Sequence, residues 1–420
     1  MQEEYLARAE RIMGRIEQLA AISEDPAGVT RTFGTPAFVR GRALVQSWLE
    51  AAGLATRVDG IGNLRGRLIS RNPGAKTLVL ASHIDTVVNA GKFDGPLGVL
   101  MALDLLENLA AKAISLPFHV KLIAFSDEEG VRFHTTYLGS RVVAGSFDPT
   151  VLARADAAGV TLAEALTAMG ADASQIPADA IPAADWLGYF EMHIEQGPVL
   201  WERQIPVALV TAIAGQRRVE LRFRGVAGHA GTVPMDRRQD ALCAAAEFIL
   251  IAEQFALHHD QGLVATVGQL TVRHAASNVI PGEVRCSLDL RSANEAQLAD
   301  AYEALRTYTA AIATQRNVEL EWNLVQQTAP VACDRNLNAL LTQAITGAGH
   351  EAVGLVSGAG HDAVPISAVA PATMMFIRCF KGISHNPLEN VELTDLAAAI
   401  EVADRFLVEL KRNVELGIKN

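Results

Sequence analysis

The sequence contains little cysteine, and the cysteines that it has form no motif. Four are scattered through 420 residues, and none belongs to a CxxC pair. A disulfide framework and a thiolate zinc site both need closely grouped cysteines, so the sequence excludes both. Scattered cysteines of this kind are typical of a reducing compartment, and we expect a cytoplasmic protein.

Positive charge is also in deficit. The chain has 36 Lys and Arg against 47 Asp and Glu, a formal net charge of −11. Such a chain repels phosphate backbones, so we expect no nucleic-acid partner. A small anionic substrate is still compatible with this balance, because a few arginines can bind it locally.

Long apolar runs and nucleotide motifs are missing as well. The most apolar stretches, such as LVLASHIDTVV, are short and contain polar residues, so we expect no membrane span. The N-terminal MQEEYLARAERIMGRIEQLAAIS is charged throughout and lacks the apolar core of a signal peptide. Neither GxxxxGK(S/T) nor a strand–GxGxxG–helix unit occurs, which argues against a nucleotide-binding fold.

What is present is the composition of a globular protein, with half of the residues apolar and a fifth charged. A chain of this length predicts two domains. Up to about residue 212, strand and helix patterns alternate, with buried strands expected in KTLVLASHID and HVKLIAFSDEEG. Residues 150–187 are rich in alanine and predict mostly helix. This alternation indicates an α/β sheet covered by helices.

The pattern changes between residues 213 and 329. There the order is strand–helix–strand–strand–helix–strand, typical of a small α+β, ferredoxin-like domain. The α/β pattern then resumes and ends in a helix. We therefore predict an α/β protein whose larger domain, residues 1–212 and 330–420, has a mixed sheet flanked by helices and is interrupted by the smaller domain, residues 213–329.

The segment HIDTVVNAGKFDG carries His83, Asp85 and Asp94. His83 and Asp85 lie at the C-terminal end of a predicted buried strand and point the same way, because strand side chains repeat every two residues; ligands gather at such strand ends in open α/β sheets. Asp94 lies in a glycine-rich loop, where a carboxylate can approach a cation closely. By itself the segment fits equally well a hydrogen-bonded core histidine followed by an aspartate in a turn.

FSDEEG places Glu128 and Glu129 side by side at the end of another buried strand. One carboxylate of such a pair can bind a metal while the other accepts a proton from water. The commonest fate of an EE pair is an exposed acidic turn. The buried apolar strand that leads into this pair favours the functional reading.

Two more histidines stand beside polar motifs, His193 in EMHIEQG and His385 in GISHNP. Each alone is more often structural than a ligand. Together with the carboxylates they match a histidine–carboxylate site for divalent zinc, manganese or cobalt, without thiolates. Two ions need a bridging ligand, and the two oxygens of Asp94 suit that role.

These motifs together resemble the metal-dependent amidase family of hydantoinase/carbamoylase type, which belongs with the aminoacylases and dinuclear-zinc carboxypeptidases. The resemblance runs from about Gly28 to the C-terminus. The family's motifs occur in its order: GKFDGPLGVL, DEEGVRF, LGSRVVAG, HIEQGPVL, AGHAGTVPM, SNVIPG, SGAGHDA and GISHNP. The resemblance implies a catalytic domain with an inserted domain that carries a homodimer contact.

The resemblance also implies two divalent ions per subunit. His83 and His193 would bind one, Glu129 and His385 the other, and Asp94 would bridge them. Glu128 would be the general base, and Asp85 would orient His83. His229 would stabilise the oxyanion, often from the partner subunit. The remaining substrate contacts implied are Gln196, Asn278, Arg291, Gly360 and His361.

Several of these residues have simpler interpretations. His229 also fits a turn histidine, Arg291 a surface charge on a strand, and His361 with Asp362 a structural pair.

The implied reaction is hydrolysis of a ureido or carbamoyl C–N bond in a small carboxylic acid. Asp127 before the EE pair resembles the allantoate branch, while N-carbamoyl-L-amino-acid hydrolase, β-ureidopropionase and ureidoglycolate hydrolase stay open. A peptidase fits DEEGVRF and SNVIPG less well. An inactive metal-binding scaffold is a different class, and the presence of Glu128 argues against it, since a scaffold needs no base.

Overall fold

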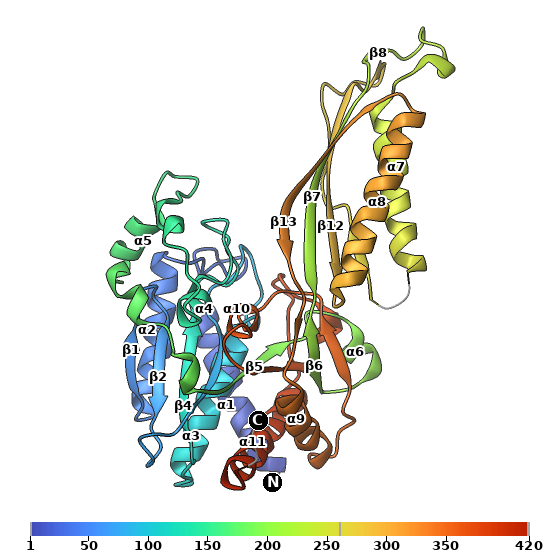
Figure 1. Cartoon of the computed structure of the whole chain (residues 1–420). Helices are drawn as coiled ribbons and strands as arrows, with labels where there is room; N and C mark the ends of the chain where they lie inside the picture. The colour runs from blue at the N-terminus through green and yellow to red at the C-terminus, as the bar shows by residue number, and fades with distance from the viewer. Residues whose placement is uncertain (1, 260–261, 418–420) are drawn as a thin grey trace. The chain divides into compact units, whose positions relative to one another are not determined.

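The chain folds into two compact units (Figure 1). The computed structural model describes residues 2–259 and 262–417. The smaller unit comprises Ala212–Ala332 and Val356–Ala359, and the rest of the chain forms the larger unit. Residues 356–359 therefore belong with the inserted segment, whereas the sequence placed them in the larger domain.

The larger unit is built on a mixed sheet of nine strands. β3 is parallel to both β4 and β5, and β5 is parallel to β16. β2 is antiparallel to β4, and β6 is antiparallel to β16. The strand order is β1 (Ala55–Val58), β2 (Leu64–Leu68), β4 (His119–Phe125), β3 (Thr77–His83), β5 (Trp186–Ile194), β16 (Ala372–Ile377), β6 (Val207–Ile213) and β14 (Val331–Ala332), with β15 (Gly354–Ser357) also on β6. Of these strands, β14 and the last two residues of β6 and of β15 fall within the ranges of the smaller unit.

Helices cover this sheet, so the predicted α/β class is confirmed. α3 packs against β3 and β5, and α1 and α11 pack against α3. β3 is buried along its whole length, as expected for a central strand. The helices are α1 (Gln2–Ala20), α2 (Pro36–Ala51), α3 (Pro96–Ala111), α4 (Leu138–Val143), α5 (Leu162–Ala168), α6 (Val199–Arg203), α9 (Arg335–Gly347), α10 (Ala363–Ile366) and α11 (Leu393–Glu415).

The prediction of a largely helical segment over residues 150–187 is wrong. Only α5 is an α-helix there, and the rest is loop with three short 3₁₀ turns, Pro149–Ala153, Ala173–Ala178 and Ala183–Asp185. Alanine favours helix, but Gly159 and Gly170 adopt positive φ, which ends regular helix on either side of α5.

The smaller unit has the predicted ferredoxin-like chain order. Its main sheet is antiparallel, and α7 and α8 pack against β7 and β12. Alternate residues of β7, among them Val219, Leu221 and Phe223, are buried beneath the helices. The elements are β7 (Gly215–Arg224), α7 (Ala241–His258), β9 (Val264–Thr266), β10 (Leu270–Val272), β12 (Glu283–Ser292), α8 (Glu295–Gln315) and β13 (Glu319–Thr328), with a separate ribbon of β8 (Gly228–His229) and β11 (Val279–Ile280).

One helix, α7, is long and apolar enough to cross a membrane by length and composition alone. The sequence interpretation did not allow for this. Phe248 and four alanines of α7 are nevertheless buried in the core of the smaller unit. This packing is that of the core helix of a small α+β domain.

Candidate metal centre

The predicted metal ligands come from the carboxyl ends of neighbouring parallel strands. His83 ends β3, His193 lies next to the end of β5, and Glu129 follows β4. Asp94 precedes α3, and His385 lies in the loop after β16. Because parallel strands end at the same edge of a sheet, residues up to 302 positions apart in the sequence meet there.

Two groups of ligand atoms share Asp94. Its Oδ1 lies 3.2 Å from His193 Nε2 and 3.6 Å from His83 Nε2. Its Oδ2 lies 3.2 Å from His385 Nε2, which is 3.5 Å from Glu129 Oε1. Each oxygen of one carboxylate therefore belongs to a different group, which is the arrangement of a bridging ligand.

The spacing of these atoms fits divalent metal ions. Metal–nitrogen and metal–oxygen bonds of about 2.1 Å in a tetrahedral site place two ligand atoms roughly 3.4 Å apart. The four contacts within the two groups span 3.2–3.6 Å. The donors are only imidazole nitrogens and carboxylate oxygens, a set that suits zinc, manganese or cobalt.

Electrostatics at the centre match a cation-binding role. Burial would raise the pKa of Asp94, but hydrogen bonds from His193, His385 and His83 hold it well below its ordinary value. The hydrogen bond to Asp94 raises the pKa of His385 to about 9. Without a metal, the carboxylate therefore holds positive charge on its histidines, and a divalent cation offers the same compensation.

Glu128 is buried beside the two groups of ligand atoms but is a member of neither. Burial raises its carboxyl pKa well above the ordinary value; nearby His83 lowers it, and nearby carboxylates add to the rise. Burial and the charge of Asp94 raise the pKa of Glu129 to about 7. A buried carboxyl with a raised pKa can accept and return a proton near neutral pH, as a general base must.

Asp85 lies at the centre and contacts both His83 and the EE pair. Its Oδ1 and Oδ2 each accept a backbone N–H, from Glu128 and Glu129 respectively, both at 3.2 Å. His83 Nδ1 bonds to the backbone carbonyl of Asp85 at 3.0 Å, and lies 3.6 Å from its carboxylate. Asp85 thus contacts His83 through both its backbone carbonyl and its carboxylate, and the carboxylate also holds the backbone of the EE pair.

Glu389 and Ser384 also support the centre, and sequence reasoning missed both. Glu389 is buried, and its Oε1 accepts the backbone N–H groups of Phe93 at 2.7 Å and Asp94 at 3.0 Å. Ser384 donates to Asp94 Oδ2 at 2.7 Å and contacts Glu389 Oε2 at 3.2 Å. The only signal in the sequence is that Glu389 follows His385 by four residues.

A glycine allows the metal loop to approach His83. Gly95 has φ +83°, and a Cβ there would lie 2.4 Å from His83 Cε1. Both the backbone conformation and the lack of space therefore require glycine next to Asp94.

Three predicted substrate residues lie in the larger unit near the centre. Gln196 donates from Nε2 to Asp94 Oδ2 at 2.7 Å. The ring of His361 meets that of His193 edge-on, with centroids 4.7 Å apart, and burial lowers the pKa of His361. Gly360 adjoins Tyr137, whose hydroxyl would be 1.7 Å from an added Cβ. The suggested partner of His361, Asp362, accepts a hydrogen bond from Ser140.

The other three lie in the smaller unit. His229 and Asn278 are exposed and close together, because the β8–β11 ribbon pairs His229 with Val279. Arg291 lies on β12, where its guanidinium contacts Asp289 at 2.9 Å and donates to the carbonyl of Gly358 at 2.6 Å. The ribbon thus brings His229 and Asn278 together, whereas Arg291 lies on a different strand, β12.

The larger unit has a mixed sheet covered by helices, and the inserted smaller unit is ferredoxin-like. In the larger unit one aspartate joins two histidine–carboxylate groups beside a buried glutamate. This fold and this site together define the class of two-metal hydrolases. The comparisons with known proteins give the family. The model of peptidase family M20/M25/M40 matches residues 79–409. The chain belongs to this family.

Within the family, the likeness is to amidases of hydantoinase/carbamoylase type, as the motifs indicated. Allantoate deiminase 2 of Glycine max is 37% identical over 95% of this chain and 89% of its own. An N-carbamoyl-L-amino acid amidohydrolase of Geobacillus stearothermophilus is 37% identical over 94% and 97%. A crystal structure of a hydantoinase/carbamoylase family amidase from Burkholderia multivorans has a TM-score of 0.90 and 33% identity, covering 96% of this chain and 97% of that one.

Proposed function

We propose that this protein is a metal-dependent amidohydrolase that cleaves the ureido or carbamoyl C–N bond of a small carboxylic acid. One observation carries the proposal: Asp94 joins two histidine–carboxylate groups beside a buried Glu128 that belongs to neither. The named relatives, an allantoate deiminase and a carbamoyl-amino-acid amidohydrolase, support this kind of substrate. An inert scaffold needs ligands but has no use for the extra buried base.

Divalent ions held by His83, His193, Asp94, Glu129 and His385 would polarise the scissile carbonyl and make a water molecule more acidic. Glu128 accepts a proton from the attacking water and delivers it to the leaving nitrogen, so that one water is consumed for each bond broken. The raised pKa of Glu128 lets it hold that proton between the two steps.

The remaining predicted residues would bind the substrate. Arg291 and Asn278 suit its carboxylate, since a guanidinium grips a carboxylate with two parallel bonds and an amide donor completes the contact. Gln196, Gly360 and His361 would line the site, and His229 would stabilise the oxyanion.

We propose allantoate as the substrate, with N-carbamoyl-L-amino acids as the alternative. Relatives of both names are equally similar, at 37% identity, so overall likeness does not favour either. Asp127 before the EE pair favours allantoate. Its side chain is buried next to the catalytic pair, where burial and the charge of Asp85 raise its pKa.

The test is ammonia release by manganese-supplemented enzyme on allantoate and on N-carbamoyl-L-amino acids in parallel. We expect turnover of allantoate. Turnover of the carbamoyl acids alone would keep the mechanism and reverse the substrate. No ammonia from either substrate, after reconstitution with zinc, manganese or cobalt in turn, would contradict the proposal and favour a scaffold.

We further propose a homodimer that associates through the smaller unit. α7 leaves Leu250 61% exposed and Leu257 71% exposed, and exposed apolar residues on a folded domain are typical of an interface. Light scattering should give twice the chain mass for the native protein. Leu250→Lys with Leu257→Lys should give a monomer, whereas Val408→Lys, at an apolar site on α11 that is 53% exposed, should not.

We also propose a cytoplasmic location. All four cysteines are free in the structure, which supports a reducing compartment. Cell fractionation would test it.

A further inference from the structure

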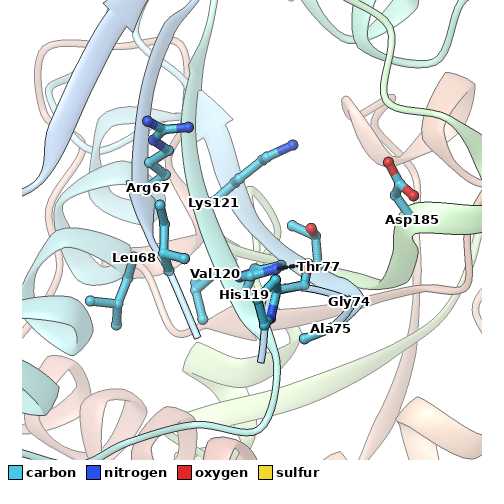
Figure 2. A pocket seen from close by; sticks show the side chains of 11 residues that line it. Arg67, Leu68, Gly74, Ala75, Thr77, His119, Val120, Lys121 and Asp185 are labelled. Carbon is cyan, nitrogen blue, oxygen red and sulfur yellow. Dashed lines mark hydrogen bonds between the residues drawn. The ribbon is translucent and has the colours of Figure 1, made fainter. Parts of the chain in front are cut away.

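The larger unit has a cavity at the end of its sheet away from the metal centre (Figure 2). It has a volume of about 430 Å³ and is lined by the ends of β2 and β4, the turn at Pro73–Ala75, and Asp185. Thr77, which begins β3, lines it, whereas His83 at the far end of β3 belongs to the metal centre. Six residue steps of about 3.3 Å separate the two by roughly 20 Å, too far for one small substrate.

Two pairs of cations face each other on one side of strands β1, β2 and β4. Arg57 lies directly opposite Arg65, and Arg67 lies directly opposite Lys121. Residues opposite each other on antiparallel strands share a face, and Arg65 and Arg67, two apart on β2, share it too. Like charges in such pairs repel and destabilise the sheet.

The chain neutralises the first pair and not the second. Arg57 contacts Asp179 at 2.7 Å, and Arg65 donates to Asp59 at 2.7 Å. The side chains of Arg67 and Lys121 make no hydrogen bond or ion pair with any residue in 2–259 or 262–417. They are also the arginine and the lysine that line the cavity, and Figure 2 shows their side chains leaving neighbouring strands, with the ammonium of Lys121 on the side of Asp185.

We propose that this cavity binds a small oxyanion, a carboxylate or a phosphate group, between Arg67 and Lys121. The guanidinium supplies a planar fork of donors and the ammonium a point charge, a combination that suits either anion. This inference does not depend on the proposed catalytic function.

Two further features limit the ligand. Asp185 lies across the cavity from the two cations, so a long polyanion would be repelled and a short ligand accepted. Lys121 is half-buried, and its pKa is lowered by burial and by the nearby charge of Arg65, while the charge of Asp185 acts to raise it. Asp185 lines the same cavity but forms no ion pair with Lys121 in the part of the chain that the structure describes, so a bound anion would add negative charge next to the two cations.

The test is thermal unfolding of the whole metal-loaded protein, titrated with inorganic phosphate and separately with succinate at constant ionic strength. Phosphate or succinate should raise the Tm by a few degrees, and the anion with the larger effect identifies the preferred group. The double variant Arg67→Gln/Lys121→Gln should lose this rise. Arg71→Gln removes one exposed charge from the adjoining turn and should keep it. A rise in Tm caused by anion binding at the metal centre would persist in the double variant, so the double variant separates it from a rise caused by binding in this cavity.

Two more measurements keep the proposal testable. Without added anion, Arg67→Gln should leave the Tm unchanged or raise it, because it removes an uncompensated repulsion, whereas Arg57→Gln should lower it. An amine-reactive acylating reagent should label Lys121 more slowly in the presence of the binding anion, as mapped by mass spectrometry. An equal Tm rise in the native protein and the double variant, no rise with either anion, or unprotected Lys121 would overturn the proposal.

Discussion

The two units hold their functional residues in opposite ways. In the larger unit the metal-centre groups are mostly buried and bonded to one another, as Asp94 is to His193, Gln196 and Ser384. In the smaller unit His229 and Asn278 are exposed, and Arg291 is held by an acid and a carbonyl of its own unit. On the proposed function, the larger unit would hold the metal ions, the general base and the contacts of Gln196, Gly360 and His361, and the smaller unit would supply the oxyanion donor and the carboxylate contacts. Substitutions should then fall into two groups, those that change metal binding or chemistry and those that leave the metal untouched.

The largest expected effect separates two neighbouring residues of the larger unit. Glu128→Gln should lower kcat by about 10³-fold or more, because the proton carrier is lost while both ligand groups persist. Metal content, measured by elemental analysis, should stay at the native value. Glu129→Gln is the matched control, since it removes a member of a ligand group and should lower metal content as well. Substantial turnover by Glu128→Gln would remove it as the base.

The next effect tests the smaller unit. His229→Asn should lower kcat by roughly 10²- to 10³-fold, the usual cost of losing an oxyanion donor, with unchanged metal content and Tm. His229 is exposed, so its loss should not disturb the fold. Loss of metal in this variant would break the division between the units.

Mixing inactive variants then decides which subunit supplies His229. If it acts across the dimer, a subunit with His229→Asn keeps its own Glu128 and receives His229 from a partner with Glu128→Gln. Random mixing of the two should restore about one quarter of native activity, since half of the dimers are mixed and each has one intact site. If His229 acts within its own subunit, every site carries a defect and no activity returns.

The third effect concerns the support beneath Asp94. Glu389→Ala leaves two backbone N–H groups near the metal loop without their acceptor, so metal affinity should fall by roughly 10- to 100-fold. Glu389→Gln keeps one oxygen acceptor and should recover part of the loss. Calorimetric titration of the metal-free protein with manganese measures this directly, without reference to activity. Glu392→Ala, three residues on and in contact with Arg378, should bind metal normally. Equal affinity in Glu389→Ala and the native protein would contradict the assignment.

The structure brings together the five residues that the sequence named as candidate ligands, because strand ends meet at one edge of a parallel sheet. His83 and His193 lie at the ends of β3 and β5, and Glu129 follows β4. Sequence reasoning failed where a contact is set by tertiary structure alone. Glu389 is 296 residues from Phe93, and no local pattern connects the two.

The chain's local preferences were also overridden in the segment before β5. Alanine-rich composition predicted helix, and glycines with positive φ interrupted it on either side of α5. Residues 356–359 joined the smaller unit although they lie far from it in sequence, and Arg291 bonds to Gly358 there. Patterns of polarity report which residues are buried, and they carry no information on which distant segment covers them.

The smallest expected effect is on substrate binding by Arg291. Arg291→Ala should raise KM for the carboxylate substrate by roughly 10-fold, because one charge-assisted contact is lost, and should change kcat much less. Arg218→Ala is the matched control: Arg218 contacts the same Asp289 at 3.1 Å but has no predicted role with substrate, so its KM should stay native. If both variants raise KM equally, the effect comes from freeing Asp289 and not from a lost substrate contact. If only Arg291→Ala does so, with metal content unchanged, the smaller unit supplies the anion contact and the division between the units holds.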